Sequence, residues 1–489
     1  MPSGGLRNAA RRVREEVRIK RRDFIKTVAA GVGGLSVLDA RGQSAAPAKK
    51  PLRVALIGCG GQGVGTLLPQ ACSERVVALA DPDPRCIEAA LARVRKATPS
   101  ADTAAIKTFS DYRKLFDTMG KELDAVIIAT PNHQHAPSAL MAMRRGIHVY
   151  VEKPLTHTIH EARLLRDEAK RCGVVTQMGQ HGHSNEGCRR LCEYIWAGAI
   201  GQVHEVHCWT SRCDGLYDGK HSPALPLPEG MDWEAWIGPA PFRDFHSDLH
   251  PHGWHLWHDF GNGSVGNMAC HLVDPSYWAL KLKAPEAVEI EDMYGGIGNV
   301  WPIRTRIRWD FPAREGMDPV KVYFYDGLAA DQKYSEQTVE RRWRNTAKRE
   351  YQYLPPLLIE LEKKYGRDFG RNGSLLVGDK GIMTIGEFGD ACRIVPEEAH
   401  RAFPMPDKLL PRIKGSHQSD FFRACHGGAS ACANFEYSAP LAEIALLGNI
   451  AMLAGLKRRV EWDGAAMRCT NRPELNRFLK PAYRDGWRM

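Results

Sequence analysis

Short apolar runs alternate with helical patterns from residue 52 onward. Continuous runs of Val, Ile, Leu and Ala predict strands that are buried on both faces, as in a parallel sheet. We expect five of them, at Arg53–Ile57, Val76–Ala80, Ala125–Ala129, His148–Val151 and Val174–Gln177. The intervening helices are expected near Gly63–Cys72, Pro84–Lys96, Asp111–Phe116, His135–Arg145 and His157–Arg171. This alternation predicts an α/β domain with a parallel sheet.

The pattern changes after residue 184, where a predicted helix near 185–197 is followed by alternating residues over Gly201–Trp209. Alternation predicts a half-buried strand, and therefore a second domain of a different kind. Within that domain, the charged segment 325–372 contains helical patterns at Gln337–Lys348 and Leu357–Lys364. We interpret this segment as an insertion, either a surface arm or a contact between the subunits of a homo-oligomer.

Composition and charge narrow the class of protein. At 489 residues, with 43% hydrophobic and 25% charged residues, the chain has the profile of a soluble globular protein of two domains. Residues 1–46 hold ten basic and four acidic side chains, so the net charge of +10 leaves only about +4 for the rest. Without a long basic block, nucleic acid is not an expected partner. The thirteen cysteines include no C-x-x-C pair, which argues against a disulfide framework or a zinc ribbon.

A glycine-rich loop follows the first predicted strand and opens the first predicted helix, at Gly58-Cys59-Gly60-Gly61-Gln62-Gly63. In a dinucleotide-binding Rossmann domain, such glycines permit a tight turn, a close approach to the pyrophosphate and close packing of helix on strand. Asp81 ends the second strand, where a carboxylate takes the ribose hydroxyls and repels a 2′-phosphate. NAD is therefore expected rather than NADP, with contacts from Gly58, Gly60, Gly61, Gln62, Gly63 and Asp81.

Two further motifs carry a resemblance to a known family. Ala129-Thr130-Pro131-Asn132-His133-Gln134-His135 follows one predicted strand, and Val151-Glu152-Lys153-Pro154-Leu155 follows the next. Together they resemble the glucose–fructose oxidoreductase/inositol dehydrogenase (Gfo/Idh/MocA) family. The resemblance implies a Rossmann domain over 47–180 and an α+β domain over 181–489 with a large open, mostly antiparallel sheet. It also implies cofactor contacts from Thr130, Pro131, Asn132, His135, Glu152, Lys153 and Gln180.

The segment from Asn267 to Asp274 is the strongest catalytic candidate of the second domain. Asn267 and His271 are four residues apart, so both can face one substrate from a single helix. The resemblance implies that His271 is the general base and that Lys153 holds the reacting oxygen. The family pattern has aspartate where this chain has Asn267, and an asparagine can neither accept a proton nor supply negative charge. This departure puts ordinary dehydrogenase turnover in question.

Histidines and tryptophans crowd the stretch from His250 to His258. Aromatic faces and a few polar groups are what a sugar-binding pocket needs. The substrate contacts we expect are Trp254, His255, Trp257, Asp274 and His417. His181 and His183 have no third ligand at a suitable spacing, so no metal is expected.

The N-terminal residues have the pattern of a targeting signal. Lys20-Arg21-Arg22-Asp23-Phe24-Ile25-Lys26 precedes a weakly apolar run over Thr27–Leu38, and Ser44 and Ala46 offer a cleavage site. This pattern resembles a twin-arginine export signal and predicts a periplasmic protein, with an uncleaved anchor as the alternative. The twin-arginine machinery moves folded proteins, so we expect a tightly held NAD that is recycled on the enzyme, and cysteines buried before export.

Three functions stay open at this point. The leading one is an NAD-dependent oxidoreductase acting on a secondary hydroxyl of a sugar, polyol or glycoside. The second is a redox-neutral glycosidase or lyase that oxidises the substrate transiently and eliminates a group before the hydride returns. The third, which only Asn267 favours, is a non-catalytic protein that contains NAD and binds sugars.

Overall fold

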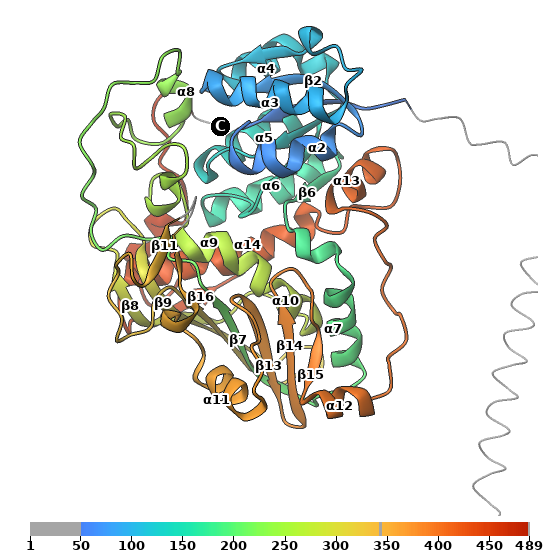
Figure 1. Cartoon of the computed structure of the whole chain (residues 1–489), viewed down its shortest axis with the longest axis vertical. Helices are drawn as coiled ribbons and strands as arrows, with labels where there is room; N and C mark the ends of the chain where they lie inside the picture. Colours follow the sequence, from blue (N-terminus) through green and yellow to red (C-terminus); the bar gives the residue numbers. More distant parts are fainter. Residues whose placement is uncertain (1–49, 342–344, 488–489) are drawn as a thin grey trace, which may run out of the picture. The chain divides into compact units, whose positions relative to one another are not determined.

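Two sheets organise the chain from Pro51 onward (Figure 1). The structure is a computed structural model that describes residues 50–341 and 345–487. The predicted export signal over residues 1–46 lies outside this range. Pro51 and all described residues after it belong to one compact unit.

The first sheet is parallel and has six strands in the order β3-β2-β1-β4-β5-β6. Its strands are β1 (Arg53–Ile57), β2 (Arg75–Ala80), β3 (Lys107–Phe109), β4 (Ala125–Ile128), β5 (His148–Val151) and β6 (Thr176–Met178). All five predicted strands are confirmed to within two residues at each end. The sequence missed β3, because this edge strand has three residues of which two are exposed. The order is that of a doubly wound Rossmann fold, which reverses direction between β1 and β4.

Helices cover both faces of this sheet, and the predicted ones are present. They are η1 (Gly63–Leu67) with α2 (Leu68–Ala71), α3 (Pro84–Ala97), α4 (Tyr112–Met119), α5 (His135–Met143) and α6 (Ile159–Cys172), with short turns η2 (Thr103–Ala105), η3 (Gly120–Glu122), η4 (Asn132–Gln134) and η5 (His181–Ser184). Local sequence sets their starts: Asp83 and Asp111 each accept a hydrogen bond from the backbone two residues on. Thr158 and Glu161 form a reciprocal capping box at the start of α6.

The second sheet has nine strands in the order β15-β14-β13-β7-β10-β9-β8-β16-β17. They are β7 (Val203–Thr210), β8 (Ala287–Gly295), β9 (Pro302–Phe311), β10 (Val320–Asp326), β13 (Gly373–Gly378), β14 (Gly381–Gly386), β15 (Arg393–Val395), β16 (Val460–Asp463) and β17 (Arg468–Cys469). The pair β7–β10 is parallel and the other pairs are antiparallel. The expected large, mostly antiparallel sheet is therefore confirmed.

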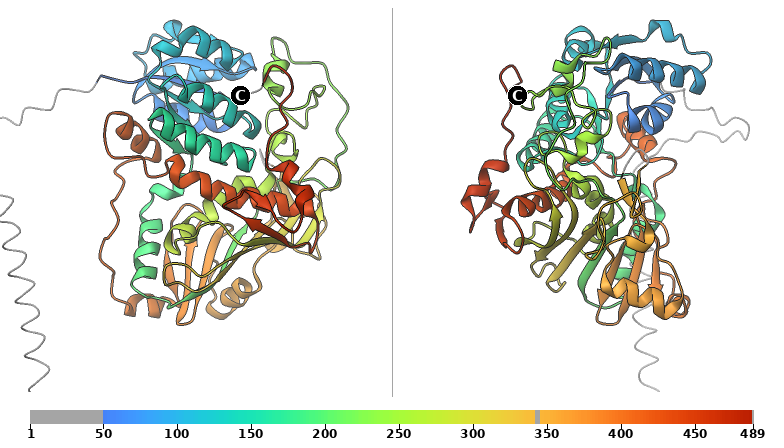
Figure 2. Two further views of the ribbon diagram at one scale, coloured as in Figure 1. Left: turned by 180° about the vertical axis from the view of Figure 1, so that it is seen from behind. Right: turned by 60° about the vertical axis from the view of Figure 1, so that its left-hand side comes forward.

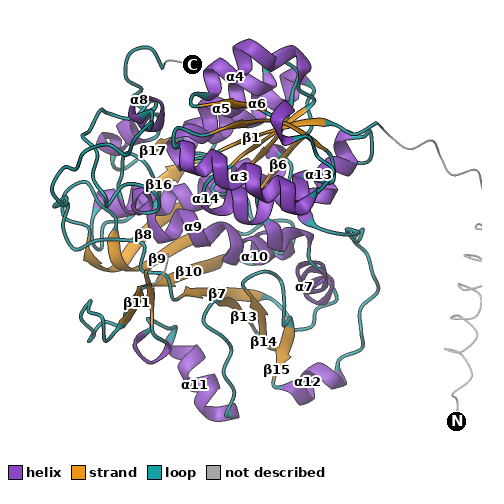
Figure 3. Cartoon of the chain, turned by 45° about the horizontal axis from the view of Figure 1, so that its top comes forward, coloured by secondary structure: helices purple, strands orange, loops and turns teal. Residues whose placement is uncertain are grey.

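Helices lie between this sheet and the Rossmann domain (Figures 2 and 3). The helices of the second half are α7 (Glu186–Trp196), α8 (Trp233–Ile237), α9 (Gly263–Leu272), α10 (Asp274–Ala279), α11 (Pro356–Tyr365), α12 (Glu397–Ala402), α13 (His417–Cys425) and α14 (Phe435–Ala454), with turns η6 (Gly253–Leu256), η7 (Arg349–Tyr351) and η8 (Pro473–Phe478). The long helix α14 packs against α6 of the first domain and against α9 and β8 of the second. One apolar core therefore runs through both domains.

Helix α14 is also, by length and composition, the one helix in the described part of the chain that could cross a membrane, with a mean hydropathy of 1.3. However, 78% of the tested window is buried inside the protein, as in the core helix of a globular fold.

The charged segment between β10 and β13 corrects one prediction. Residues 337–348 were expected to be helical, but they contain the hairpin of β11 (Val339–Arg341) and β12 (Asn345–Ala347). Tertiary packing overrides the local pattern here, because Val339 and Ala347 are buried in one cluster with Cys213 and Ile303. The predicted helix at 357–364 is confirmed as α11.

The glycine loop yields a stability prediction with a built-in control. A Cβ at Gly63 would stand 2.1 Å from the carbonyl oxygen of Gly58, whereas one at Gly65 would meet nothing within 4 Å. We expect Gly63→Ala to destabilise the fold by about 1–3 kcal/mol through overpacking, and Gly65→Ala to be neutral or slightly stabilising. Thermal unfolding of the two variants checks this, and equal melting temperatures would contradict the assigned packing.

Candidate active site

A cavity of about 900 Å³ lies at the carboxyl edge of the parallel sheet. Such edges, at the point where the strand order reverses, are where doubly wound sheets bind ligands. Both domains contribute walls. The cofactor-side residues predicted from the sequence that line it are Gly58, Gly60, Gly61, Gln62, Asp81, Thr130, Pro131, Asn132, His135, Glu152 and Lys153. The cavity therefore collects nearly all of the predicted dinucleotide contacts.

The glycine loop owes its shape to a close approach between two chain segments. Gly58 has a φ of +89°, and a Cβ there would stand 2.6 Å from the carbonyl carbon of Ala129. Only glycine fits this position, because the loop after β1 passes directly over the loop after β4. Gly63 does not line the cavity. It packs beneath Gly58, so its predicted role in packing holds and a direct cofactor contact does not.

The carboxyl group of Asp81 is buried at the rim of this loop. Its Oδ2 accepts a hydrogen bond from the Cys59 backbone at 2.7 Å, and its Oδ1 accepts one from the Asp83 backbone at 2.9 Å. Burial raises the pKa of Asp81 to about 6, although these hydrogen bonds oppose the shift. Above that pH, a carboxylate faces the place where the ribose of a dinucleotide lies in this fold.

Two other features fit a bound dinucleotide. The hydroxyl of Thr130 is buried at the cavity wall and has no hydrogen-bond partner among the residues that the structure describes. The ring of His135 lies 2.9 Å from the carbonyl of Thr130 and 2.9 Å from that of Pro154, so it ties the loop after β4 to the loop after β5. Burial lowers the pKa of His135, which keeps this connecting ring neutral.

Glu152 is buried in the cavity wall and contacts the turn η5, which follows the last strand of the Rossmann domain. Its carboxylate lies 3.3 Å from Nε2 of His181, whose Nδ1 accepts a hydrogen bond from Gln418 at 3.1 Å. Burial would raise the pKa of Glu152, but the His181 hydrogen bond and the charge of Lys153 outweigh it, so the pKa is lowered. Glu152 is therefore a carboxylate next to Lys153.

Lys153 and Asn267 meet across the domain boundary. The Lys153 ammonium donates to the backbone carbonyl of Asn267 at 3.0 Å and also to its side-chain oxygen. The amide nitrogen of Asn267 in turn donates to Oδ2 of Asp214 at 2.8 Å. Asn267 and Asp214 are 2% and 3% exposed, so the inner part of this chain of side chains is shielded from solvent, while Lys153 is half-buried.

His271 lies one helical turn beyond Asn267 on α9, and both side chains line the cavity together with Lys153. Its ring packs edge-on against Phe388, with centroids 5.1 Å apart. The structure thus brings together the three predicted catalytic residues. The sequence missed Asp214, Arg212 and Phe388; the first two follow the end of β7, a position that could have signalled them.

A long loop of the second domain, residues 211–262, which we call the strap, closes the other side of the cavity. Its backbone at Asp232 donates to the Pro82 carbonyl at 2.9 Å. The ring of His250, within the strap, lies 2.9 Å from the Asp83 carboxylate. Trp236 of the strap accepts a hydrogen bond from the Gln134 side chain at 2.7 Å. The strap is therefore hydrogen-bonded to the Rossmann domain at several points, of which these three are examples.

Two of the predicted substrate contacts lie on the strap and line the cavity. They are Trp254 and His255, whose rings are stacked with centroids 3.5 Å apart. Trp257 is a correction: it is fully buried and packs in the apolar cluster beneath the strap. The turn η6 directs Trp254 toward the cavity and is followed by Trp257, which points into the protein. The sequence alone does not show these side-chain directions.

Hydrogen bonds correct two further predicted contacts, those of Gln180 and Asp274. Gln180 does not line the cavity, because its amide turns inward to donate to the Cys270 carbonyl. Asp274 does not line it either, and its carboxylate binds His183 at 3.1 Å and the Tyr437 hydroxyl at 2.6 Å. Gln180 is thus bonded to α9, and Asp274, the first residue of α10, is bonded to η5 and α14.

His417 does line the cavity, but both of its ring nitrogens already have partners in the protein. Nδ1 lies 2.5 Å from the Ser184 hydroxyl and Nε2 lies 2.8 Å from the Met178 carbonyl. Burial lowers the pKa of His417 to about 3. It is a neutral wall residue rather than a polar contact for a substrate.

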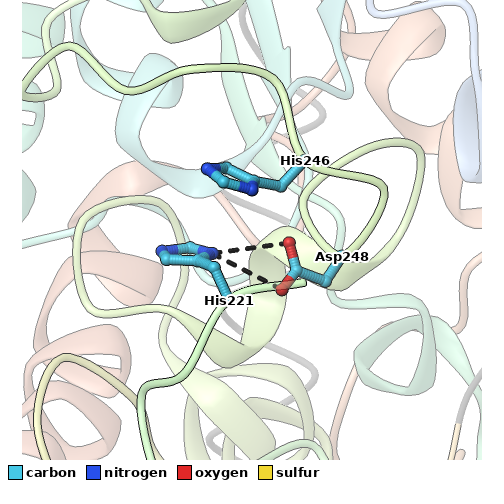
Figure 4. Close-up of side chains that lie close together, drawn as sticks. All are labelled: His221, His246 and Asp248. Carbon is cyan, nitrogen blue, oxygen red and sulfur yellow. Dashed lines mark hydrogen bonds and ion pairs between the residues drawn. The ribbon is translucent and has the colours of Figure 1, made fainter. Parts of the chain in front are cut away.

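The strap also contains a group of three potential metal ligands, His221, His246 and Asp248, whose ligand atoms lie within 4.8 Å of one another (Figure 4). Nε2 of His221 accepts a hydrogen bond from Arg243 at 3.0 Å, so its proton is on Nδ1, facing Asp248 at 3.4 Å. The His221 ring also stacks on Trp257 at 3.6 Å. Both nitrogens are engaged and a guanidinium cation is adjacent, so we interpret the group as a hydrogen-bonded brace and assign no metal to it.

Comparison with known families agrees with this architecture. Residues 52–180 match the GFO_IDH_MocA model, described as "Oxidoreductase family, NAD-binding Rossmann fold", and residues 209–295 match the model of the family's C-terminal alpha/beta domain. The fold and the first match define a two-domain protein with an NAD-binding Rossmann domain. The two matches lie in the two domains and agree with the resemblance seen in the sequence.

Curated relatives are similar over part of their length. A levoglucosan dehydrogenase of Pseudarthrobacter phenanthrenivorans is 27% identical over 37% of this chain and 40% of its own length. An inositol 2-dehydrogenase of Saccharopolyspora erythraea is 31% identical over 32% of this chain and 45% of its own. A 1-carboxy-3-chloro-3,4-dihydroxycyclohexa-1,5-diene dehydrogenase of Comamonas testosteroni is 26% identical over 58% of each chain. The chain thus spans 40–58% of the length of these relatives.

Solved structures share the fold over most of the chain. The WlbA dehydrogenase of Bordetella pertussis, in complex with NADH and UDP-GlcNAcA, superposes with a TM-score of 0.53 at 14% identity and covers 85% of this chain and 99% of its own. A levoglucosan dehydrogenase in complex with NADH and L-sorbose gives 0.50 at 19% identity, covering 84% and 99%. At these identities the likeness shows the fold alone.

The buried position of Asp81 predicts a pH-dependent cofactor preference. Above about pH 6 its carboxylate repels the 2′-phosphate of NADP, and protonation below that pH removes the repulsion. The ratio of the Kd of NADP to that of NAD should therefore fall as the pH drops from 8 to 5. Fluorescence titration measures it, and Asp81→Asn serves as the control that reports the titration of the phosphate itself. The same pH slope in both proteins would contradict the assignment.

Proposed function

We propose that this protein is an NAD-dependent oxidoreductase that oxidises a secondary hydroxyl of a sugar, polyol or glycoside. The observation that carries this proposal is the meeting of Lys153, Asn267 and His271 in one cavity beside the predicted dinucleotide site. Trp254 and His255 give that cavity an aromatic wall, and Arg212 lines it as well. Aromatic faces with few polar groups suit a carbohydrate.

Lys153 and His271 divide the work on the hydroxyl group. Lys153, held by Asn267, donates a hydrogen bond to the substrate oxygen and stabilises the negative charge that develops there. His271 removes the hydroxyl proton, as a neutral imidazole does near its working pH. A nicotinamide dinucleotide held by the glycine loop and Asp81 would supply a hydride acceptor for the same carbon. The substrate would leave as a carbonyl compound, with its hydroxyl proton held on His271.

The strap supports a cofactor that stays bound. It meets the Rossmann domain at Pro82 and Asp83, next to Asp81 in the chain, and at Gln134, so it covers part of the dinucleotide half of the cavity. A resident NAD must be reoxidised where it sits. This observation favours the second candidate function, a redox-neutral lyase or glycosidase in which the hydride returns to the substrate after elimination.

The sequence offered one argument for a non-catalytic sugar-binding protein, the asparagine at 267. In the structure Asn267 bonds to both Lys153 and a carboxyl group, so it belongs to a polar chain that reaches the cavity. A site without chemistry has no need of such a chain, and we place this third function last.

We also propose that residues 1–46 direct the folded, NAD-loaded protein to the periplasm by the twin-arginine route. This rests on the residue pattern around Arg21 and Arg22 and on the thirteen cysteines, none of which forms a disulfide. Eight of them are buried, which suits export after folding in a reducing compartment.

The first test is of activity. The protein purified with its native cofactor is mixed with a panel of sugars and glycosides, and the reduced-nicotinamide absorbance and the products are followed together. Net reduction supports the oxidoreductase, and cleavage without net reduction supports the lyase. Lys153→Ala and His271→Ala should each lower kcat/KM by about 10²–10⁴-fold with NAD binding retained, while the exposed-site controls Lys170→Ala and His204→Ala stay active. Full activity in either active-site variant would refute the roles given above.

The second test is of export. Replacing Arg21 and Arg22 by lysine should leave the protein in the cytoplasm, because the twin-arginine machinery reads that pair. Cell fractionation measures the result. The pair Arg11 and Arg12 provides the matched control, since its replacement by lysine changes the same residues outside the motif. Equal export of both variants would exclude this route.

A further inference from the structure

The asparagine at 267 raises a chemical problem that the neighbouring buried side chain resolves. An aspartate at that position would place a negative charge next to the Lys153 ammonium, whereas an asparagine brings only a dipole. Behind the amide, 2.8 Å from its nitrogen, stands Oδ2 of Asp214, which is 3% exposed. We propose that Asp214 supplies the charge missing at position 267 and, through the Asn267 amide, positions Lys153 for the reaction. This rests on the proposed role of Lys153 at the substrate oxygen.

The first part of the argument is the orientation of the amide. A carboxylate only accepts hydrogen bonds, so it must face the NH₂ group of Asn267 rather than its oxygen. The amide oxygen is thereby turned toward Lys153, which only donates. Rotating the amide by half a turn would set its NH₂ group against the ammonium and its oxygen against the carboxylate, so Lys153 and Asp214 fix the same orientation together.

The second part is the burial of the chain. Asn267 and Asp214 are nearly inaccessible to solvent, so water screens their interaction poorly. A charge at Asp214 strengthens the hydrogen bond it receives from the amide and polarises the amide oxygen that Lys153 meets. The negative charge therefore acts on Lys153 through the Asn267 amide, whereas in a site with aspartate at this position the carboxylate would contact the lysine directly.

The third part is how Asp214 is held. Its backbone nitrogen donates to the Ser264 hydroxyl of α9 at 2.9 Å, so the same helix carries both Asn267 and the support of its partner. The hairpin β11–β12 braces the segment from the other side: the backbone of Cys213 donates to Asn345 at 3.1 Å, and that of Ala347 donates to Ser211 at 2.7 Å. The hairpin in the segment between β10 and β13 thus supports the residues next to Asp214.

A second acid lies in the same layer but does not take part. The carboxyl group of Asp326 accepts from the backbone and hydroxyl of Thr305 at 2.5 and 2.6 Å. Burial raises its pKa to about 7, and the proximity of Asp214 adds to the shift. With one acid facing Thr305 and the other facing Asn267, Asp214 is the partner of the Lys153 chain.

The test is a charge swap. In Asp214→Asn the charge is lost, and kcat should fall about 10- to 100-fold, the size expected for a lost hydrogen bond to a charged group. In Asn267→Asp two carboxyl groups face each other and compete for one proton, so activity should also fall. The double variant Asn267→Asp/Asp214→Asn keeps one carboxylate and one amide in the chain, and its kcat should recover to within a few fold of the parent.

A readout that needs no turnover separates this proposal from the proposed function. Acetylation of Lys153 by a small anhydride, quantified by mass spectrometry across pH, reports how strongly the ammonium is stabilised. Its midpoint should move to lower pH in Asp214→Asn and return in the double variant, even if no substrate is known. An unchanged midpoint in Asp214→Asn, or single and double variants that are equally impaired, would overturn the role of Asp214. Normal acetylation shifts without any turnover on the substrate panel would instead count against the proposed function.

Discussion

The site depends on the contact between Lys153 and Asn267. Lys153 follows the end of β5 in the Rossmann domain, and Asn267 belongs to α9 in the second domain, so their hydrogen bonds join the two halves at the reacting centre. A partly buried ammonium needs acceptors, since leaving its charge unpaired away from water is costly. The requirement fixes how α9 sits over the sheet edge, and with it the place of His271. The hydrogen bonds of the Lys153 ammonium therefore help to set the geometry of the cavity.

The rest of the structure holds that contact in place. Helix α14 packs on both α6 and α9 and makes the domains share a core, so the two halves of the site are fixed relative to each other. The strap closes the dinucleotide side through polar contacts, while its own interior rests on stacked aromatic rings such as His221 on Trp257. Apolar packing gives the rigidity, and hydrogen bonds across the cavity give the orientation.

Several features were readable in the sequence because local physics determines them. The strands of the parallel sheet are buried on both faces and appear as continuous apolar runs, and the glycine loop can only be glycine where chain segments nearly touch. Residues four apart on one helix, such as Asn267 and His271, were correctly expected at one site. Predictions failed where side-chain direction decides the outcome: Trp257, Gln180 and Asp274 lie in the right segments but turn into the protein.

The sequence by itself determined the fold class and the dinucleotide loop, since each depends on neighbours within a few positions of the chain. It also proposed Lys153, Asn267 and His271 as catalytic residues, and all three line one cavity. Only the tertiary structure decided what stands behind Asn267. Asp214 is 53 residues away in the chain, and its meeting with α9 depends on β7, the strap and the hairpin β11–β12 packing together. A long-range contact of this kind leaves no mark in local pattern or composition, because it is set by the packing of whole elements rather than by the residues beside it.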